Sequence, residues 1–282
     1  MELVERGLLK PEDLDGAKLD WGDTEAVIDI SRKIANKQGK AGALLGLGVK
    51  RIADKLGGDA YKYAVHVKGQ ELAAHDPRGF KPRGVSYAMG QLGGDHHEGN
   101  SPEGQAIFAW CNSAVTCTLA TAVPWTKRNP GIVCEMLNSL CGWSMKPDDY
   151  WTTAKRIITL ARMFSIREGN VSRKDDVLPV RLTTEPLPEG PKKGVVFTEK
   201  DTKDMQDSYY NYYGWDANGI PTVDTLKALR LDFAIPPDAK PAPVQEAPVK
   251  AAAAKDPNLP KGPEPAKSPQ PAAQGAQPAK KK

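Results

Sequence analysis

The sequence lacks the features of a membrane-spanning protein and of a disulfide-bonded secreted scaffold. It contains no run of about 18 consecutive apolar residues, the length that crosses a bilayer as a helix, and its mean hydropathy is −0.50. The first residues, MELVERGLLKPEDLDG, include acids and lack the apolar stretch of a secretory signal. Four cysteines among 282 residues are too few for a disulfide framework. We therefore predict a protein of a reducing, cytoplasmic compartment with no membrane span.

The distribution of charge does not indicate a nucleic-acid-binding protein. The formal net charge is +4, and residues 235–282 carry this excess as eight lysines against four acids. Residues 1–234 retain 31 basic and 31 acidic residues, so their composition gives no sign of the basic face that nucleic acid requires. We therefore predict no nucleic-acid partner.

Residues 235–282 have the composition of a disordered tail. They hold 12 of the 24 prolines and no aromatic residue. Such a segment cannot bury enough apolar surface to offset the chain entropy that folding removes. A solvated spacer is the ordinary interpretation, and a weak electrostatic contact through Lys280, Lys281 and Lys282 is the alternative.

Apolar residues recur at helical spacing through residues 1–234 and predict a mainly α fold of several helices. Val27, Ile30 and Ile34 share one face after Thr24, which we expect to cap a helix reaching Lys37. Similar patterns predict helices at 45–56, 105–122, 131–141, 147–166, 199–213 and 222–229.

The remaining segments show other local signals. Alternation within YKYAVHVKGQEL makes residues 61–72 the best candidate strand. Residues 76–104 form a Gly- and Pro-rich loop broken by a short segment near 86–89, and residues 169–197 are expected to be extended. Thr198 and Asp201 resemble a capping box, and Gly214 stands where a helix-ending glycine belongs. We expect residues 1–234 to form one helical region or two subdomains with a boundary near 60–105.

The loop GGDHHEG at residues 93–99 is the first candidate site. His96 and His97 are flanked by acidic residues. They can be metal ligands, a general acid/base pair, or polar residues of the surface. The pair lacks the H-x-x-x-H or H-x-H spacing of a self-contained metal site, so the sequence leaves these alternatives open.

Two further clusters have ordinary structural explanations. The four cysteines lack a C-x-x-C pair, so burial in the core explains each of them, although one can still serve as the distant ligand of a cluster. The aromatic run YYNYYGWD at residues 209–216 fits core packing at a helix end better than a stacking platform. No P-loop, G-x-G-x-x-G or G-x-S-x-G motif is present.

Several stretches, taken in order, resemble the C-terminal helical region of the tungsten-containing aldehyde:ferredoxin oxidoreductase family. KYAVHVKGQELAAHDPRG (62–79) and VSYAMGQLGGDH (85–96) carry the likeness most clearly. MELVERGLLKPEDLDGAKLDWGD, FSIREGNVSRKDDVLPVRL, EPLPEGPKKG and YYGWDANGIPTVDTLKALRL extend it over most of residues 1–231. The resemblance implies tungstopterin and one [4Fe–4S] cluster as cofactors.

The resemblance also implies roles for residues after the candidate loop. Family members carry a D-x-x-G-L-C element that contacts one pterin and supplies the fourth cluster ligand. The matching stretch here is NSAVTC, which makes Cys117 the implied metal ligand and Asn112, Thr116 and Cys117 the implied cofactor-binding residues. Asn112 replaces the acid, and Val115 replaces the glycine.

The family places a histidine near its substrate, which implies His96 as the catalytic residue and His97 as a near alternative. Asp95 stands where members have a cysteine. Such departures fit a divergent branch, for example a tungsten subunit of an aromatic-ring reductase of the benzoyl-CoA type.

The family's first pterin-binding domain and its cysteine triplet have no counterpart here. We therefore expect the C-terminal portion of an oxidoreductase that oxidises aldehydes to carboxylic acids and passes electrons to a ferredoxin-like acceptor. It would be inactive without the N-terminal half or upstream subunit, and an exposed apolar face would favour homo-oligomers. A non-catalytic, partner-binding helical module is the alternative from another class.

Overall fold

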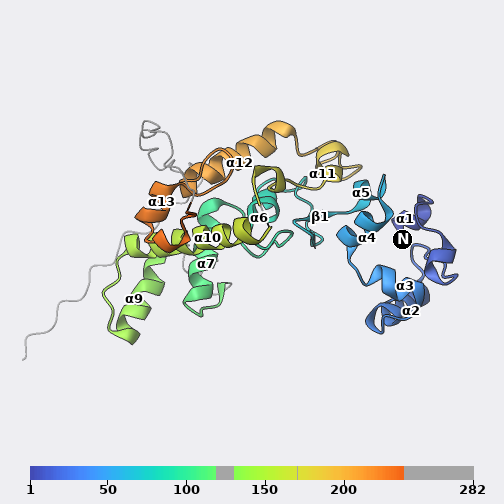
Figure 1. Ribbon diagram of the computed structural model, residues 1–282, viewed down its shortest axis with the longest axis horizontal. Helices are drawn as coiled ribbons and strands as arrows, with labels where there is room; N and C mark the ends of the chain where they lie inside the picture. Colours follow the sequence, from blue (N-terminus) through green and yellow to red (C-terminus); the bar gives the residue numbers. More distant parts are fainter. Residues whose placement is uncertain (119–129, 170, 238–282) are drawn as a thin grey trace, which may run out of the picture. The chain divides into compact units, whose positions relative to one another are not determined.

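Short and medium helices, with one small hairpin, make up the described structure (Figure 1). The computed structural model describes residues 1–118, 130–169 and 171–237. The elements in chain order are α1 Glu2–Glu5, the 3₁₀ helix η1 Pro11–Leu14, α2 Thr24–Ala35, α3 Gly39–Leu45, α4 Val49–Leu56, α5 Ala60–Tyr63, β1 His66–Val67, β2 Gln70–Glu71, α6 Arg83–Met89, α7 Pro102–Ser113, α9 Pro130–Cys141, α10 Pro147–Gly169, η3 Arg173–Asp175, α11 Val180–Thr184, α12 Glu199–Tyr213, α13 Val223–Ala228 and η4 Asp232–Ala234.

The mainly α fold predicted from the sequence is confirmed, and several helix ends lie where local signals placed them. Thr198 and Asp201 form the reciprocal capping box of α12, and Gly214 ends that helix at φ 71°. Thr222 caps α13. In the described residues no helix has both the length and the apolar content needed to span a bilayer.

Helix boundaries in residues 24–56 differ from the prediction. Asp23, not Thr24, caps α2, because its carboxylate accepts from the Ala26 N–H at 3.0 Å. The predicted helix 45–56 begins only at Val49. The preceding α3 was not predicted, because its capping group is the Asp15 carboxylate, which accepts from the Lys40 and Ala41 N–H groups at 3.1 and 3.0 Å.

The strand predicted over residues 61–72 is wrong for most of its length. Residues 60–63 form α5. A short hairpin follows, in which the strands β1 and β2 have two residues each. Its turn residues Lys68 and Gly69 have φ of 51° and 92°, the left-handed conformation that tight hairpins require. The segment 169–197, expected to be extended, contains η3 and α11.

Further along the chain, α7 begins earlier than predicted and ends earlier. Ser101 caps it by accepting from the Gly104 N–H at 2.9 Å, and the helix stops at Ser113. Ile235 packs against the apolar cluster of α10 and α13. Residues from 238 onward lie outside the described structure, and the disorder of the tail stays a prediction.

A core of aromatic and aliphatic side chains joins α6, α10 and α12. Tyr209, Tyr210 and Tyr213 of α12 pack with Tyr87 of α6 and with Trp215. Two phenol groups also tie α12 to α7, since Tyr209 Oη donates to Gln105 Oε1 at 2.6 Å and Tyr213 Oη donates to the Pro102 carbonyl at 2.7 Å. These contacts fix the first turn of α7, which directly follows the GGDHHEG loop.

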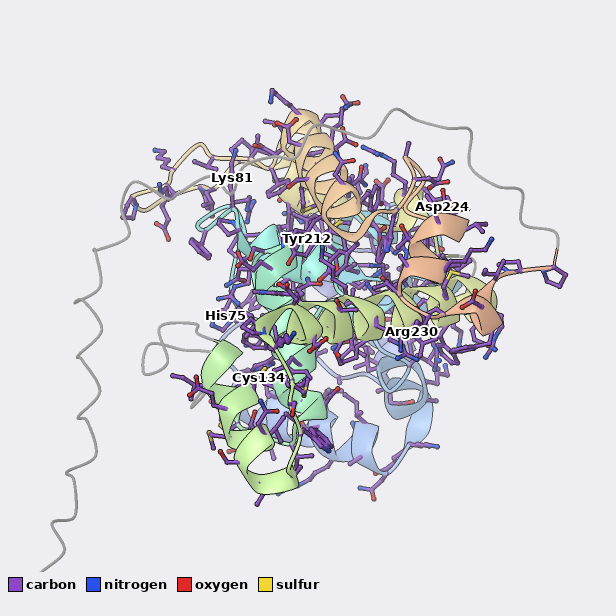
Figure 2. All side chains as sticks on the ribbon, turned by 90° about the vertical axis from the view of Figure 1, so that its left-hand side faces the viewer. His75, Lys81, Cys134, Tyr212, Asp224 and Arg230 are labelled. Atoms are coloured by element: carbon purple, nitrogen blue, oxygen red, sulfur yellow. The ribbon has the colours of Figure 1, made fainter. Side chains whose placement is uncertain are left out.

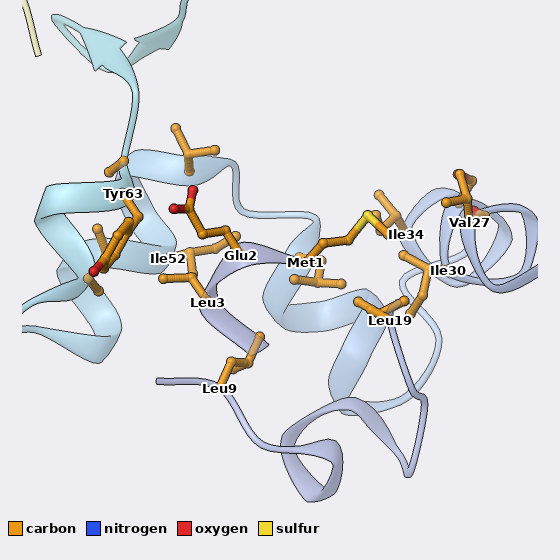
Figure 3. A pocket seen from close by; sticks show the side chains of 16 residues that line it. Met1, Glu2, Leu3, Leu9, Leu19, Val27, Ile30, Ile34, Ile52 and Tyr63 are labelled. Atoms are coloured by element: carbon orange, nitrogen blue, oxygen red, sulfur yellow. The ribbon is translucent and has the colours of Figure 1, made fainter. Parts of the chain in front are cut away.

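Apolar side chains from α1 to α5 and η1 line a cavity of about 360 Å³ that is partly open to solvent (Figure 3). Burial of Leu14 and Ala41 shows that this apolar cluster is otherwise well packed.

Candidate functional site

The loop between α6 and α7 carries both predicted catalytic histidines, and two side chains of α6 hold its backbone. The Ser86 hydroxyl donates to the carbonyl of Asp95 at 3.0 Å. The Arg83 guanidinium donates to the carbonyl of His96 at 3.0 Å. The two accepting carbonyls belong to Asp95 and His96 themselves. These hydrogen bonds from α6 therefore position the backbone that carries the His96 imidazole.

Close contact with the β1–β2 hairpin explains two of the loop glycines. A Cβ at Gly94 would lie 2.5 Å from the carbonyl oxygen of Gln70, and one at Gly93 would lie 2.6 Å from that of Val67. Gly93 also has φ 95°, which L residues rarely adopt. The loop therefore rests on the backbone of the hairpin, and a larger residue would displace it.

The imidazole of His96 lies between two other imidazoles. Its ring centroid is 4.6 Å from that of His75 and 3.8 Å from that of His97. The side chain of His96 is 21% exposed, whereas that of His97 is 75% exposed. Burial lowers the pKa of His96, and the nearby His97, His75 and Arg83 lower it further. A neutral imidazole at neutral pH can accept a proton or a hydrogen bond.

Asp95 is paired with His97 rather than directed only at His96. Its carboxylate accepts from the His97 backbone N–H at 2.9 Å and lies 2.9 Å from the ring Nδ1. Burial alone would raise the pKa of Asp95, but these hydrogen bonds hold it below its ordinary value. Ligand atoms of Asp95, His96 and His97 come within 4.8 Å of one another. The geometry thus accommodates both chemical alternatives, a shared proton and a shared metal ion.

Sequence reasoning gave no role to Glu98, whose carboxyl group is buried beneath this loop. Its Oε2 atom has no hydrogen-bond partner in the described residues, and neither does the buried Oδ1 atom of Asn100. Burial raises the pKa of Glu98 to about 7, although the Leu92 N–H and Lys68 favour the charged form. The only signal in the sequence was an acid beside two histidines, which does not reveal burial.

Three charged residues distant in sequence form a buried network where the loop begins. The Lys68 ammonium donates to the carbonyls of Ala88 and Gly90 at 2.8 and 3.0 Å and pairs with Asp176 at 2.8 Å. Asp176 also pairs with Arg162 at 2.7 Å, and both of these side chains are almost fully buried. The network ties the end of α6 to α10 and to the segment after η3.

The implied cofactor-binding residues Asn112, Thr116 and Cys117 lie at the end of α7. Thr116 N–H donates to the Cys111 carbonyl at 2.9 Å and Val115 N–H to the Asn112 carbonyl at 3.2 Å, which is a Schellman motif. Val115 occupies its left-handed position at φ 55°. Glycine is preferred there, and Val115 is the residue that replaces the family's glycine. Cys117 follows directly and is exposed, as is Asn112.

The structure does not bring the histidines and Cys117 together. The histidine loop leads into the first turn of α7, whereas Cys117 follows its last turn. Twelve helical residues separate these ends by roughly 18 Å.

A complete [4Fe–4S] cluster does not fit the cysteines of this chain. Cys111 and Cys134, the latter labelled in Figure 2, are buried in the apolar cluster of α7, α9 and α10. Cys117 and Cys141 are exposed. In the described ranges, no grouping of three or more metal-ligating side chains includes a cysteine. Since a cubane cluster requires four ligands, at least two would have to come from elsewhere.

Comparison with known proteins gives one family match and several relatives. Residues 1–231 match the family profile described as "Aldehyde ferredoxin oxidoreductase, domains 2 & 3". A tungsten-containing aldehyde ferredoxin oxidoreductase of Pyrococcus horikoshii is 33% identical over 82% of this chain and 41% of its own length. An "Aliphatic sulfonate oxidoreductase, WOR-like subunit" of Pyrococcus furiosus is 36% identical over 82% of this chain and 38% of its own.

A solved structure shares the fold. The "Active site complex BamBC of Benzoyl Coenzyme A reductase in complex with 1,5 Dienoyl-CoA" superposes with a TM-score of 0.55 at 22% identity. The match covers 83% of this chain and 42% of that chain. The chain thus spans about two-fifths of the length of the relatives it matches.

Proposed function

The chain belongs to the aldehyde ferredoxin oxidoreductase family, a family of tungsten oxidoreductases, and from this premise we propose that it forms the C-terminal portion of an enzyme that oxidises aldehydes to carboxylic acids. The proposed enzyme needs a further polypeptide portion, because this chain spans only about two-fifths of the relatives. A ferredoxin-like protein is the proposed electron acceptor, and the cytoplasm the proposed location.

The observation that carries this proposal is the imidazole of His96, which is largely shielded from solvent and whose pKa is lowered by burial. Its backbone is held by Arg83, and its ring lies against that of His75. A low pKa leaves the ring free to accept a proton when an aldehyde becomes an acid, or to hydrogen-bond the substrate oxygen. When bound, tungstopterin would supply the two-electron redox chemistry.

Two parts of the chain are suited to hold the cofactors. The buried acceptors Glu98 Oε2 and Asn100 Oδ1 fit the N–H donors of a pterin ring. Asn112 and Thr116 stand at the end of α7, where the family element contacts a pterin. Cys117 is exposed and supplies one cluster ligand in this proposal, with the other three supplied by the missing portion.

A second candidate function is that of a tungsten subunit in a reductase of the benzoyl-CoA type. The shared fold with the benzoyl-CoA reductase complex is compatible with it. Asp95, paired with His97, also gives this loop an acid where the family has a cysteine. Reduction of an aromatic thioester by the assembled protein, with no aldehyde turnover, would favour this candidate.

We expect His96→Gln to lower kcat for aldehyde oxidation by about 10²- to 10⁴-fold, the range typical of a lost general acid or base. The assay requires the chain assembled with the polypeptide that carries the preceding family domain. His97→Gln should cost less than about tenfold, because His97 is 75% exposed. His66→Gln, which lies in β1, is the matched control. A larger loss for His97→Gln would reassign the role to that residue.

Metal analysis tests the role of Cys117 separately. The assembled protein should contain tungsten and about four irons per complex, and Cys117→Ser should lose iron and the visible absorbance of the cluster. Cys141→Ser is the matched control, since Cys141 is also exposed. Retention of iron by Cys117→Ser would contradict the assignment. Metal-free protein in every sample would favour the non-catalytic helical module.

A further inference from the structure

The cavity of about 360 Å³ among α1 to α5 is lined almost entirely by apolar side chains (Figure 3). Leu3, Leu19, Ile30, Ile34 and Ile52 form much of its wall. No residue of the histidine loop lines it. The cavity is therefore a feature that the proposed oxidoreductase activity does not explain.

Two polar side chains at the cavity, those of Ser31 and Glu2, already have partners. Ser31 donates to the carbonyl of Val27 at 2.7 Å, which uses its hydrogen. The Glu2 carboxylate accepts from Arg181 at 2.8 Å and lies 3.7 Å from Arg6. Arg181 also pairs with Glu185 at 2.9 Å. A ligand in this cavity would thus find mostly apolar surface, with the Tyr63 hydroxyl and the Met1 amino group as further polar groups.

The charged side chains around Glu2 and Tyr63 balance one another. Glu2 and Glu185 balance Arg6 and Arg181, and Arg6 and Arg181 both lie over the ring of Tyr63. A charged head group would lose its hydration among the apolar side chains that form most of the wall. An uncharged aliphatic molecule has no such hydration shell to lose.

We propose that this cavity binds an uncharged aliphatic molecule with on the order of a dozen carbon atoms. The size follows from volume, because a dry apolar cavity of about 150 Å³ holds one benzene ring. At about 360 Å³ the cavity has the volume of a small-ligand site. Dispersion contacts with the aliphatic wall would supply the affinity.

Thermal unfolding of the full chain with 1-decanol tests the proposal without any cofactor. At a concentration about a hundredfold above Kd, the Tm should rise by roughly 5 °C or more. Decanoate, which has a charged head, should give a clearly smaller shift. Ala53→Leu should abolish the 1-decanol shift, because Ala53 is buried and lines the cavity. Ala43→Leu, exposed on α3, should retain it.

Val49→Phe blocks the same cavity and replaces Ala53→Leu if that variant does not fold. An unchanged Tm with 1-decanol would show that the cavity closes in solution. An equal shift in the blocked variant would show that the alcohol binds elsewhere. Loss of the shift once the chain is assembled with its missing portion would show that side chains of that portion fill the cavity. Each of these three results would overturn the proposal.

Discussion

Asp176→Asn is expected to lower the free energy of unfolding by about 3 to 5 kcal/mol, the cost of breaking a buried ion pair from one side. The carboxylate is fully buried and pairs with both Lys68 and Arg162. It also accepts from the Tyr210 hydroxyl at 2.7 Å. The substitution keeps the shape of the side chain but leaves two buried cations without a counter-charge. Urea unfolding of the purified chain measures the effect.

Asp204→Asn is the matched control for that experiment. Asp204 pairs with Lys200 one turn along α12, where both side chains are mostly exposed. Exposed pairs of this kind contribute less than about 1 kcal/mol. A loss for Asp176→Asn no larger than that of the control would mean that the buried network does not hold the end of α6.

Glu98→Gln is expected to stabilise the protein above pH 7 and to flatten its dependence on pH. Burial raises the pKa of Glu98 from 4.5 to about 7. A raised carboxyl pKa gives stability that is fully present below pH 4.5 and is lost as the pH rises through 7. The shift corresponds to up to about 3 kcal/mol. Glutamine stays neutral, so the variant should exceed the wild type by up to that amount at pH 8.

Urea unfolding between pH 4 and pH 8 measures this difference, and Glu189→Gln is its control. Glu189 is exposed, so its neutralisation should leave the pH dependence of stability almost unchanged. Parallel pH profiles for the wild type and Glu98→Gln would mean that Glu98 ionises normally. In that case the orphaned Oε2 atom would be solvated in solution.

Some helix ends were predictable where the capping group lies within a few residues of the helix it caps, although the local caps Asp23 of α2 and Ser101 of α7 were missed. The capping box of Thr198 and Asp201 and the terminal Gly214 are of this kind. Prediction failed for α3, because its cap is the carboxylate of Asp15, more than twenty residues away. Short-range patterns carry no information about such a partner.

The candidate site was predictable in part. The sequence placed His96 and His97 in one glycine-rich loop, and the structure brings Asp95 to the same place. The sequence gave no reason to expect that His75 stacks against His96 or that the Glu98 carboxyl group is buried. The residue that replaces the family glycine, Val115, has a left-handed backbone, which the sequence alone did not indicate. Catalysis by His96 and ligation by Cys117 stay predictions.

The sequence by itself determined the mainly α fold, several helix ends and the family, because these depend on residue spacing and on ordered motifs over residues 1–231. Only the tertiary structure decided which charges are buried. Lys68, Arg162 and Asp176 come together from three separate segments. The pKa of Glu98 depends on the same folding. Electrostatic energies are set by distance and solvent exposure in space, and neither can be read from positions along the chain.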